Sequence, residues 1–162
     1  MGIKVILDIT FSIICVAIAI MDIQKQTIYN EAVAVLLVPA IVSFFVCSEV
    51  DGVSRMFGAV SVSGLMLMIC VLMPGAFGGG DIKFMVPVGL FLGLEKTVAA
   101  WVLSVFLGAL WVVAEVLLRW WNTQNREGHK ATCRKAVENL REMTFPFGPA
   151  LCIGSIATLW WG

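Results

Sequence analysis

Two aspartates stand at positions of this sequence where a charged side chain is costly. Asp22 closes the apolar run Val5–Met21, and Asp81 directly follows Gly78-Gly79-Gly80. An ionisable residue in a membrane-embedded segment is expensive and is by default a hypothesis for function. Two carboxyl groups a few ångströms apart share a proton, so the ionised one can accept a proton from an attacking water while the other protonates the developing oxyanion. This is the chemistry of an aspartyl protease, which needs no metal and no cofactor.

The glycine run before Asp81 favours an irregular backbone. Each glycine costs about 1 kcal/mol relative to alanine in a helix interior. Irregular backbone at membrane depth is tolerated only where it is buried in protein or lines a watery cavity. The alternative interpretation is that Asp22 merely ends a helix and that Gly78–Gly80 is a loop or hinge in a non-enzymatic transporter or assembly subunit. The residues alone leave both interpretations open.

Other hydrolytic and metal chemistries have less support. His129 is the single histidine and lies in a polar stretch, so no histidine is available inside the membrane for a metal site or a serine–histidine pair. No H-E-x-x-H motif occurs. The five cysteines contain no C-x-x-C pair, and we expect them to pack as small hydrophobic residues.

The remaining carboxylates are weaker candidates than the two aspartates. Asp8 lies near the start of the first apolar run. We expect Asp51 to be solvated in a short loop that also contains Arg55. Glu31 and Glu115, near the expected cytoplasmic membrane surface, are the fallback candidates if the aspartates are not the reactive pair.

The composition predicts a membrane protein. The 162 residues are 60% hydrophobic and 14% charged, with a mean hydropathy of +0.95, whereas soluble domains carry about 25% charged residues. The 11 basic and 11 acidic residues cancel, which gives no support to nucleic-acid binding. We expect an all-α, polytopic integral membrane protein that forms one domain over residues 1–162. Its six candidate spans are Val5–Met21, Ala32–Cys47, Gly58–Met73, Lys83–Leu94, Thr97–Leu118 and Phe145–Trp161.

Two of these runs allow an alternative. Lys4 precedes the first run as in a secretory signal, but Asp8 and the five further runs argue against that interpretation. The fourth run is short for a full crossing and contains Pro87, so a protein with five spans is the alternative.

The basic residues orient the chain, although they do not decide the number of spans. With six spans, eight basic residues face one compartment and three face the other, namely Lys4, Arg55 and Lys96. The positive-inside rule then assigns three connections to the cytoplasm: Ile23–Asn30, Pro74–Ile82 and Arg119–Thr144. Five spans again give eight against three, with the opposite orientation. Under either count Asp22 and Asp81 face the same side, because two complete spans separate them.

The polar connection at residues 119–144 has apolar residues at helical spacing. This pattern is typical of a short helix on an anionic membrane surface. A solvated loop is the equally supported alternative.

Three segments of the sequence resemble the type IV prepilin peptidases, a family of GxGD membrane aspartyl proteases. Gly78-Gly79-Gly80-Asp81-Ile82-Lys83-Phe84 is similar to the family's G-x-G-D-x-K motif. Asp22 followed by Ile28-Tyr29-Asn30 is similar to its first aspartate and the later I-P-N sequence. Phe145-Pro146-Phe147-Gly148-Pro149 is similar to the P-F-G-P stretch that opens its last span. The order of the three motifs is also that of the family.

The resemblance implies a function and a set of site residues. Asp22 and Asp81 would be the catalytic aspartates. The remaining motif residues would shape the site or position the substrate: Gly78, Gly80, Lys83, Asn30, Pro146, Phe147, Gly148 and Pro149. The substrate would be the membrane helix of a prepilin or pseudopilin, cut after the glycine that ends its leader, at the cytoplasmic face of the cell (inner) membrane. Lys83 would favour the ionised form of Asp81 or contact the substrate, or would simply extend its amino group to the membrane surface.

The sequence departs from the family at two places. Tyr29 replaces the usual proline, so the turn loses a fixed φ angle and gains an N–H and a phenol. Long members carry a domain with paired C-x-x-C motifs after the first span and are credited with N-methylating the new N-terminus. The connection Ile23–Asn30 is too short for that domain. The resemblance is therefore to a short form, and methylation by this chain is in doubt.

Overall fold

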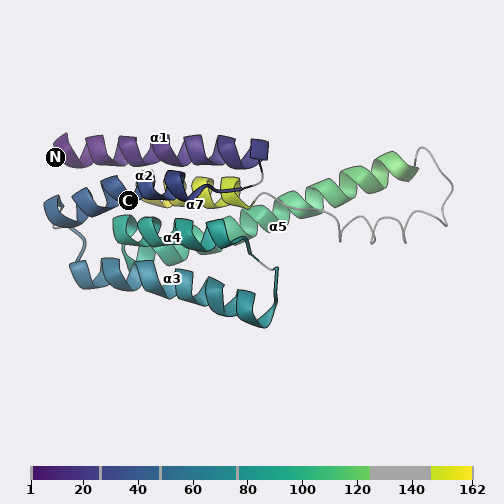
Figure 1. Cartoon of the computed structure of the whole chain (residues 1–162). Coiled ribbons are helices and arrows are strands. Elements are labelled where there is room, and N and C mark those ends of the chain that lie inside the picture. The colour runs from purple at the N-terminus through teal and green to yellow at the C-terminus, as the bar shows by residue number, and fades with distance from the viewer. Residues whose placement is uncertain (1, 26, 48, 76, 125–146, 162) are drawn as a thin grey trace.

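The described residues of the computed structural model form helices joined by short connections. The structure describes residues 2–25, 27–47, 49–75, 77–124 and 147–161. With the labels of Figure 1, the helices are α1 (Gly2–Lys25), α2 (Asn30–Val46), α3 (Gly52–Leu72), α4 (Gly79–Leu92), α5 (Leu94–Gln124) and α7 (Gly148–Trp160). No strand occurs in these residues, so the predicted all-α fold of a polytopic membrane protein is confirmed.

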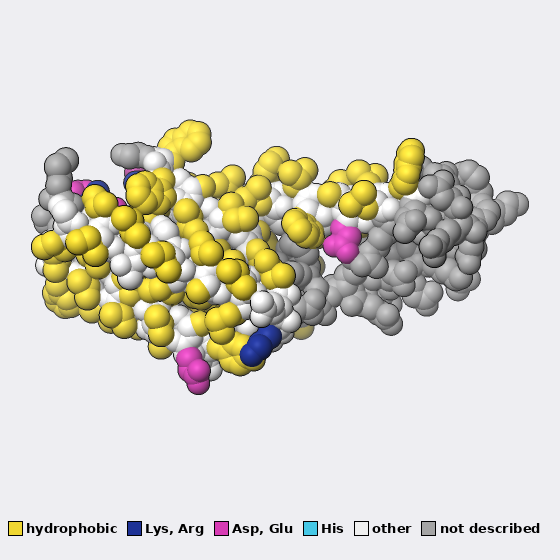
Figure 2. All heavy atoms as spheres, turned by 90° about the horizontal axis from the view of Figure 1, so that it is seen from above, with side chains coloured by type: hydrophobic (Ala, Val, Ile, Leu, Met, Phe, Trp, Pro, Cys, Tyr) yellow, Lys and Arg dark blue, Asp and Glu magenta, His cyan; other side chains and the backbone are white. Residues whose placement is uncertain are grey.

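Three of these helices are long and apolar enough to cross a membrane. They are α1, α3 and the Leu94–Leu118 part of α5, while α2 and α7 are shorter apolar helices. Their outward faces remain apolar: Figure 2 shows hydrophobic side chains over much of the visible surface. Such a surface suits lipid and would be unfavourable in water. The chain is therefore a membrane protein.

Successive helices run in alternating directions (Figure 1). As a result α1, α3 and α5 end near one end of the bundle, where α2, α4 and α7 begin. Helix α5 extends beyond the other helices at this end. Both predicted catalytic aspartates lie here, since Asp22 is in the last turn of α1 and Asp81 is in the first turn of α4.

Helix α4 lies in the middle of the bundle, although it is only 14 residues long. It contacts α2, α3, α5 and α7. Glycines permit the closest of these approaches: a Cβ at Gly58 would lie 2.8 Å from the Gly93 carbonyl carbon, and one at Gly89 would collide with the backbone of Gly58. Small residues at helix interfaces are the usual means of close packing in membranes. The surrounding helices thus hold α4, and with it Asp81, in place.

The glycine run differs from the sequence-based expectation. Gly78 is the N-cap of α4, and Gly79 and Gly80 are the first two helical residues. The irregular backbone lies before them, at Met73–Gly75 and at Phe77. Helix α4 therefore begins earlier than Lys83, where the predicted span starts, and includes Asp81 in its first turn.

Arg55 contradicts the expectation that it lies in a loop. Its side chain is 2% exposed and lies within α3. The guanidinium donates hydrogen bonds to carbonyl oxygens near the C-terminal ends of α2 and α4, including Cys47 O at 3.2 Å and Leu90 O at 3.1 Å. A cation is favourable at a helix C-terminus, where the last carbonyls have no helical partner. The Arg55 side chain therefore joins the ends of two helices by hydrogen bonds and is not a solvent-exposed charge in a loop. Asp51 is exposed, as expected.

Some expectations fall outside the described residues. The predicted surface helix or loop at 119–144 is described only up to Gln124, where it continues α5 beyond the predicted span end at Leu118. Pro146 and His129 also lie outside the described residues.

Candidate active site

Two buried carboxyl groups lie at the end of the bundle where α1 ends and α4 and α7 begin. Asp22 is 4% exposed and Asp81 is 8% exposed. They are the only buried carboxylates in the part of the chain that the structure describes. Asp22 also interacts electrostatically with Asp81. The fold therefore brings together the two aspartates that the sequence analysis selected, and it leaves the fallback residue Glu31 exposed.

Asp81 is held by the N-terminus of its own helix. Its Oδ2 accepts a hydrogen bond from the Gly78 N–H at 3.2 Å. A helix N-terminus leaves N–H groups without helical partners and favours negative charge, so it stabilises a carboxylate at this position. A Cβ on Gly78 would lie 3.1 Å from the same oxygen. The glycine therefore lets the backbone approach the carboxylate closely.

Asp22 is held by a helix that is distant in the sequence. Its Oδ2 accepts a hydrogen bond from the Gly148 N–H, at the start of α7, at 3.1 Å. A Cβ on Gly148 would lie 2.5 Å from that oxygen and 2.8 Å from Asp22 Cγ, so no larger residue fits without displacing the carboxylate. Pro149 stands in the first turn of α7, where a proline has no helical hydrogen bond to lose.

Two aromatic residues pack at the same end. The Phe77 ring, just before Gly78, lies 5.5 Å from the Phe147 ring between centroids. Phe147 is the N-cap of α7 and lies next to the amide that holds Asp22. The contact joins the segment before Asp81 to the segment that binds Asp22. The sequence analysis missed Phe77, whose only signal is its place directly before the glycine run.

The connection between α1 and α2 packs on the first turn of α4. A Cβ on Gly80 would lie 2.9 Å from Ile28 Cβ and 3.1 Å from Ile28 O, so glycine permits this approach. The Lys83 ammonium donates a hydrogen bond to Asn30 Oδ1 at 2.9 Å. Because α1 ends three residues after Asp22, at Lys25, both contacts help to fix the end of α1, and with it Asp22, relative to Asp81. The contact between Ile28 and Gly80 was not expected from the sequence.

Lys83 has a partner that none of the sequence-based alternatives anticipated. Those alternatives were an electrostatic action on Asp81, a contact with the substrate, or an extension to the membrane surface. The exposed Lys83 side chain instead bonds to Asn30, so it joins two motifs that lie 53 residues apart.

Tyr29 adopts a backbone conformation that proline also adopts. Its φ is −72° and its ψ is 141°, and proline fixes φ near −65°. The carbonyl of Tyr29 accepts hydrogen bonds from the N–H groups of Ala32 and Val33 and so starts α2. The Lys25 ammonium lies 5.1 Å from the centre of the tyrosine ring, a cation–π contact that restrains the turn. The conformation of this turn is therefore compatible with a proline at position 29.

Comparison with known proteins identifies the family. The profile of the type IV leader peptidase family matches residues 9–113. The chain belongs to the type IV leader peptidase family. The matched region contains Asp22, Gly78–Gly80 and Asp81, so the resemblance seen in the sequence is confirmed.

A curated relative of this leader peptidase family member comes from Bacillus subtilis (strain 168). It is named "Prepilin leader peptidase/N-methyltransferase" and is 28% identical over 155 residues, which are 95% of this chain and 55% of that protein. The chain thus spans about half the length of the relative, which is compatible with the predicted short form. No solved structure matches the chain.

Candidate metal ligands do not gather at this site. The described residues contain no group of three or more histidine, cysteine, aspartate or glutamate side chains that could hold a metal ion. The carboxyl groups of Asp22 and Asp81 are the acidic side chains that the site offers to a reaction, and each is bound by one backbone amide.

Proposed function

We propose that this protein is an aspartyl endopeptidase that removes the leader of prepilin or pseudopilin substrates by cutting the bond after a glycine. Membership of the leader peptidase family and the name of the relative support the substrate class. The observation that carries the aspartyl mechanism is the buried pair Asp22 and Asp81, in which each carboxyl group accepts a backbone N–H through its Oδ2 atom. A mere hinge at Gly78–Gly80 would have no use for Asp22 or for its bond to Gly148.

The reaction follows from the arrangement of the two carboxyl groups. Each amide favours the ionised form of its aspartate, but the mutual repulsion of two nearby negative charges opposes double ionisation. The pair then holds one proton. The ionised member takes a proton from a water that attacks the scissile carbonyl carbon, and the protonated member donates its proton to the carbonyl oxygen. Each amide occupies only one acceptor position of its carboxyl group, so Oδ1 of each aspartate has no amide partner among the described residues and remains available for this exchange.

The other motif residues would position the pair and the substrate. Gly80 and the Lys83–Asn30 hydrogen bond hold the turn after Asp22 against α4. Gly148, with the Phe147 and Pro149 that flank it, sets the start of α7 beside Asp22. We assign Gly78 the same role for Asp81, and Pro146 is included by its place in the motif.

The charges support a cytoplasmic location of this end of the bundle, in the cytoplasmic (inner) membrane crossed several times. Lys25 and Lys83 lie at the aspartate end, as does the start of the basic segment that follows α5. Lys4 and Lys96 lie at the other end, and Arg55 no longer counts as a loop charge. The positive-inside rule then favours a cytoplasmic site more strongly than the sequence alone did.

Cleavage of a co-expressed prepilin tests the proposal. Asp22→Asn and Asp81→Asn should each abolish cleavage while the protein still accumulates in the membrane. Asp51→Asn is the matched control, because Asp51 is an exposed carboxylate at the opposite end of the bundle, and it should cleave normally. Full activity of either site variant would reject the aspartyl mechanism.

The orientation has its own test. A single cysteine at exposed position 51, in an otherwise cysteine-free protein, should react with an impermeant thiol reagent added from outside the cell. Labelling only after the membrane is opened would instead place the aspartate end outside.

A further inference from the structure

The end of the bundle opposite the aspartates contains a charged cavity that the proposed peptidase does not use. It has a volume of about 230 Å³ and is lined by side chains from α1, α2, α3, α4, α5 and α7. This is somewhat below the roughly 300 Å³ at which pockets for drug-sized ligands begin, so the cavity suits a small polar group. Its charged lining residues are Lys4, Asp8, Glu49, Arg55 and Lys96.

Three of these five charges are already satisfied by the protein. Lys4 forms an ion pair with Glu49, and the hydrogen bond from Lys4 lowers the pKa of the Glu49 carboxyl, which stays ionised. Arg55 donates its hydrogen bonds to carbonyl groups and to Ser43.

Asp8 and Lys96 are different. The Asp8 carboxyl group interacts electrostatically with Lys4 and, to a smaller extent, with Lys96, yet neither the Asp8 nor the Lys96 side chain has a hydrogen-bond or ion-pair partner within the part of the chain that the structure describes. They face the same cavity as a separated negative and positive group.

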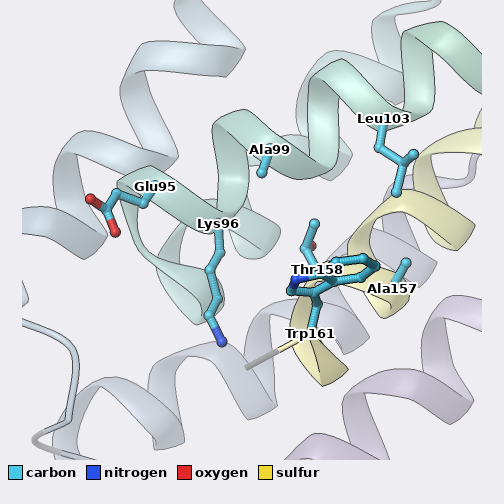
Figure 3. Close-up of a pocket in the computed structure, with 7 residues that line it drawn as sticks. All are labelled: Glu95, Lys96, Ala99, Leu103, Ala157, Thr158 and Trp161. Atoms are coloured by element: carbon cyan, nitrogen blue, oxygen red, sulfur yellow. The ribbon is translucent and has the colours of Figure 1, made fainter.

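Lys96 also stands at the mouth of an apolar groove between α5 and α7. The groove has a volume of about 350 Å³, and Ala99, Leu103, Ala157, Thr158 and Trp161 line it with Glu95 and Lys96. Figure 3 shows Lys96 and Trp161 on the same side of the groove, whereas Glu95 points away from Trp161. The groove lies along α5, one of the helices apolar enough to cross a membrane. Tryptophan and lysine are typical of the membrane–water interface.

We propose that the groove and the cavity together bind one phosphatidylethanolamine molecule of the surrounding membrane. The order of the protein groups is apolar groove, Lys96, cavity and Asp8, because Lys96 lines both spaces and Asp8 lines only the cavity. The order of groups in the lipid is acyl chain, phosphate, ethylene and primary ammonium. An acyl chain lies in the groove, the phosphate contacts Lys96, and the ammonium donates to Asp8. Each of the two unpartnered side chains thereby gains a charge-assisted hydrogen bond.

Lipid retention by the purified full chain, measured by native mass spectrometry from mixed micelles, tests this site. Phosphatidylethanolamine should be retained roughly tenfold more than phosphatidylcholine with the same acyl chains, because the choline group has no N–H to donate to a carboxylate. This comparison uses the unchanged protein, so a folding defect cannot mimic the result. Equal retention of the two lipids would overturn the proposal. Greater retention of phosphatidylglycerol than of phosphatidylethanolamine would also overturn it, since the occupant would then be an anionic lipid.

Two variants assign the contacts. Asp8→Asn should lower retention of phosphatidylethanolamine to the level of phosphatidylcholine, while Asp51→Asn, at an exposed carboxylate outside both spaces, should not. Lys96→Met should lower retention of both lipids. Lys25→Met should lower retention of neither, because Lys25 ends α1 at the opposite end of the bundle from the cavity. Wild-type lipid preference in Asp8→Asn would refute the ammonium contact.

Discussion

The sharpest prediction concerns Gly148, because the structure gives this glycine a steric and a hydrogen-bonding role at once. Its N–H donates to Asp22 Oδ2 at 3.1 Å, and its missing side chain leaves the space that this carboxylate occupies. In Gly148→Ala, the new Cβ would lie 2.5 Å from Oδ2, 2.8 Å from Cγ and 3.1 Å from Cβ of Asp22. Three atoms of one short side chain are affected, so rotation of the carboxyl group cannot relieve the clash.

The magnitude follows from the distance that Asp22 must move. Ordinary carbon–oxygen contacts begin near 3.4 Å, so relief requires a displacement of about 1 Å. A misplacement of about 1 Å in a catalytic group can cost roughly 100-fold in rate. Alanine is otherwise favourable by about 1 kcal/mol over glycine in a helix, so helix propensity cannot explain a loss of activity. We expect the cleavage rate of Gly148→Ala to fall about 100-fold, with normal accumulation in the membrane.

The assay is the rate of leader removal from a co-expressed prepilin, with protein amount measured in the same membranes. Gly79→Ala is the matched control, because Gly79 also lies in the first turn of a site helix, but a Cβ added there would meet no atom of another segment within 4 Å. It should cleave at the normal rate. If Gly148→Ala cleaves within about threefold of wild type, the bond from α7 to Asp22 does not position a catalytic group, and the reasoning fails.

Three further experiments test how the rest of the site is held. Gly80→Ala should lower cleavage at least about tenfold, because its Cβ would lie 2.9 Å from Ile28 Cβ; a normal rate would show that this turn does not set the position of Asp22. Tyr29→Pro should keep cleavage within about twofold and unfolding free energy within about 1 kcal/mol, because the entropy gain roughly offsets the lost cation–π contact. A large loss of cleavage would reveal a need for the phenol or the N–H. Lys83→Met and Asn30→Ala should each lower cleavage, and the double variant should be no worse than either, since one hydrogen bond joins them. Additive losses in this double-mutant cycle would contradict the shared role.

Much of the fold could be predicted because the membrane restricts the choice of structure. Backbone groups in lipid must be paired within the segment, so a long apolar run is a helix. This constraint placed α1, α3 and α5 correctly. It found α4 only in part, as the short run Lys83–Leu94, and missed the first turn that contains Asp81. Helix α4 has only 14 residues and is covered by four other helices, so it needs no long apolar run. Arg55 was misjudged for a related reason: its partners are carbonyls at the ends of α2 and α4, which no sequence pattern brings together.

The candidate site could be predicted as a set of residues but not as a set of contacts. Charge scarcity and the motif order selected Asp22 and Asp81. Their partners come from other segments: the Gly148 amide lies 126 residues from Asp22. Every residue except proline has a backbone N–H, so the sequence does not single out Gly148 as a donor. Only the packing of α7 against α1 could reveal it. Lys83 and Asn30 were both named from their motifs, but their mutual hydrogen bond depends on the close approach at Gly80.

The hydrogen bonds from two backbone amides to the aspartates also determine which substitution can distinguish a loss of catalysis from a loss of correct folding. An alanine at position 22 or 81 would remove the acceptor and leave a buried N–H unpaired, which costs about 1–3 kcal/mol. Lost cleavage in such a variant could then arise from a displaced α7 or α4 start. An asparagine keeps an oxygen that can accept the Gly148 or Gly78 N–H, yet it cannot exchange a proton with its neighbour. If the pair acts by sharing one proton, asparagine must therefore be as inactive as alanine while remaining as stable as aspartate.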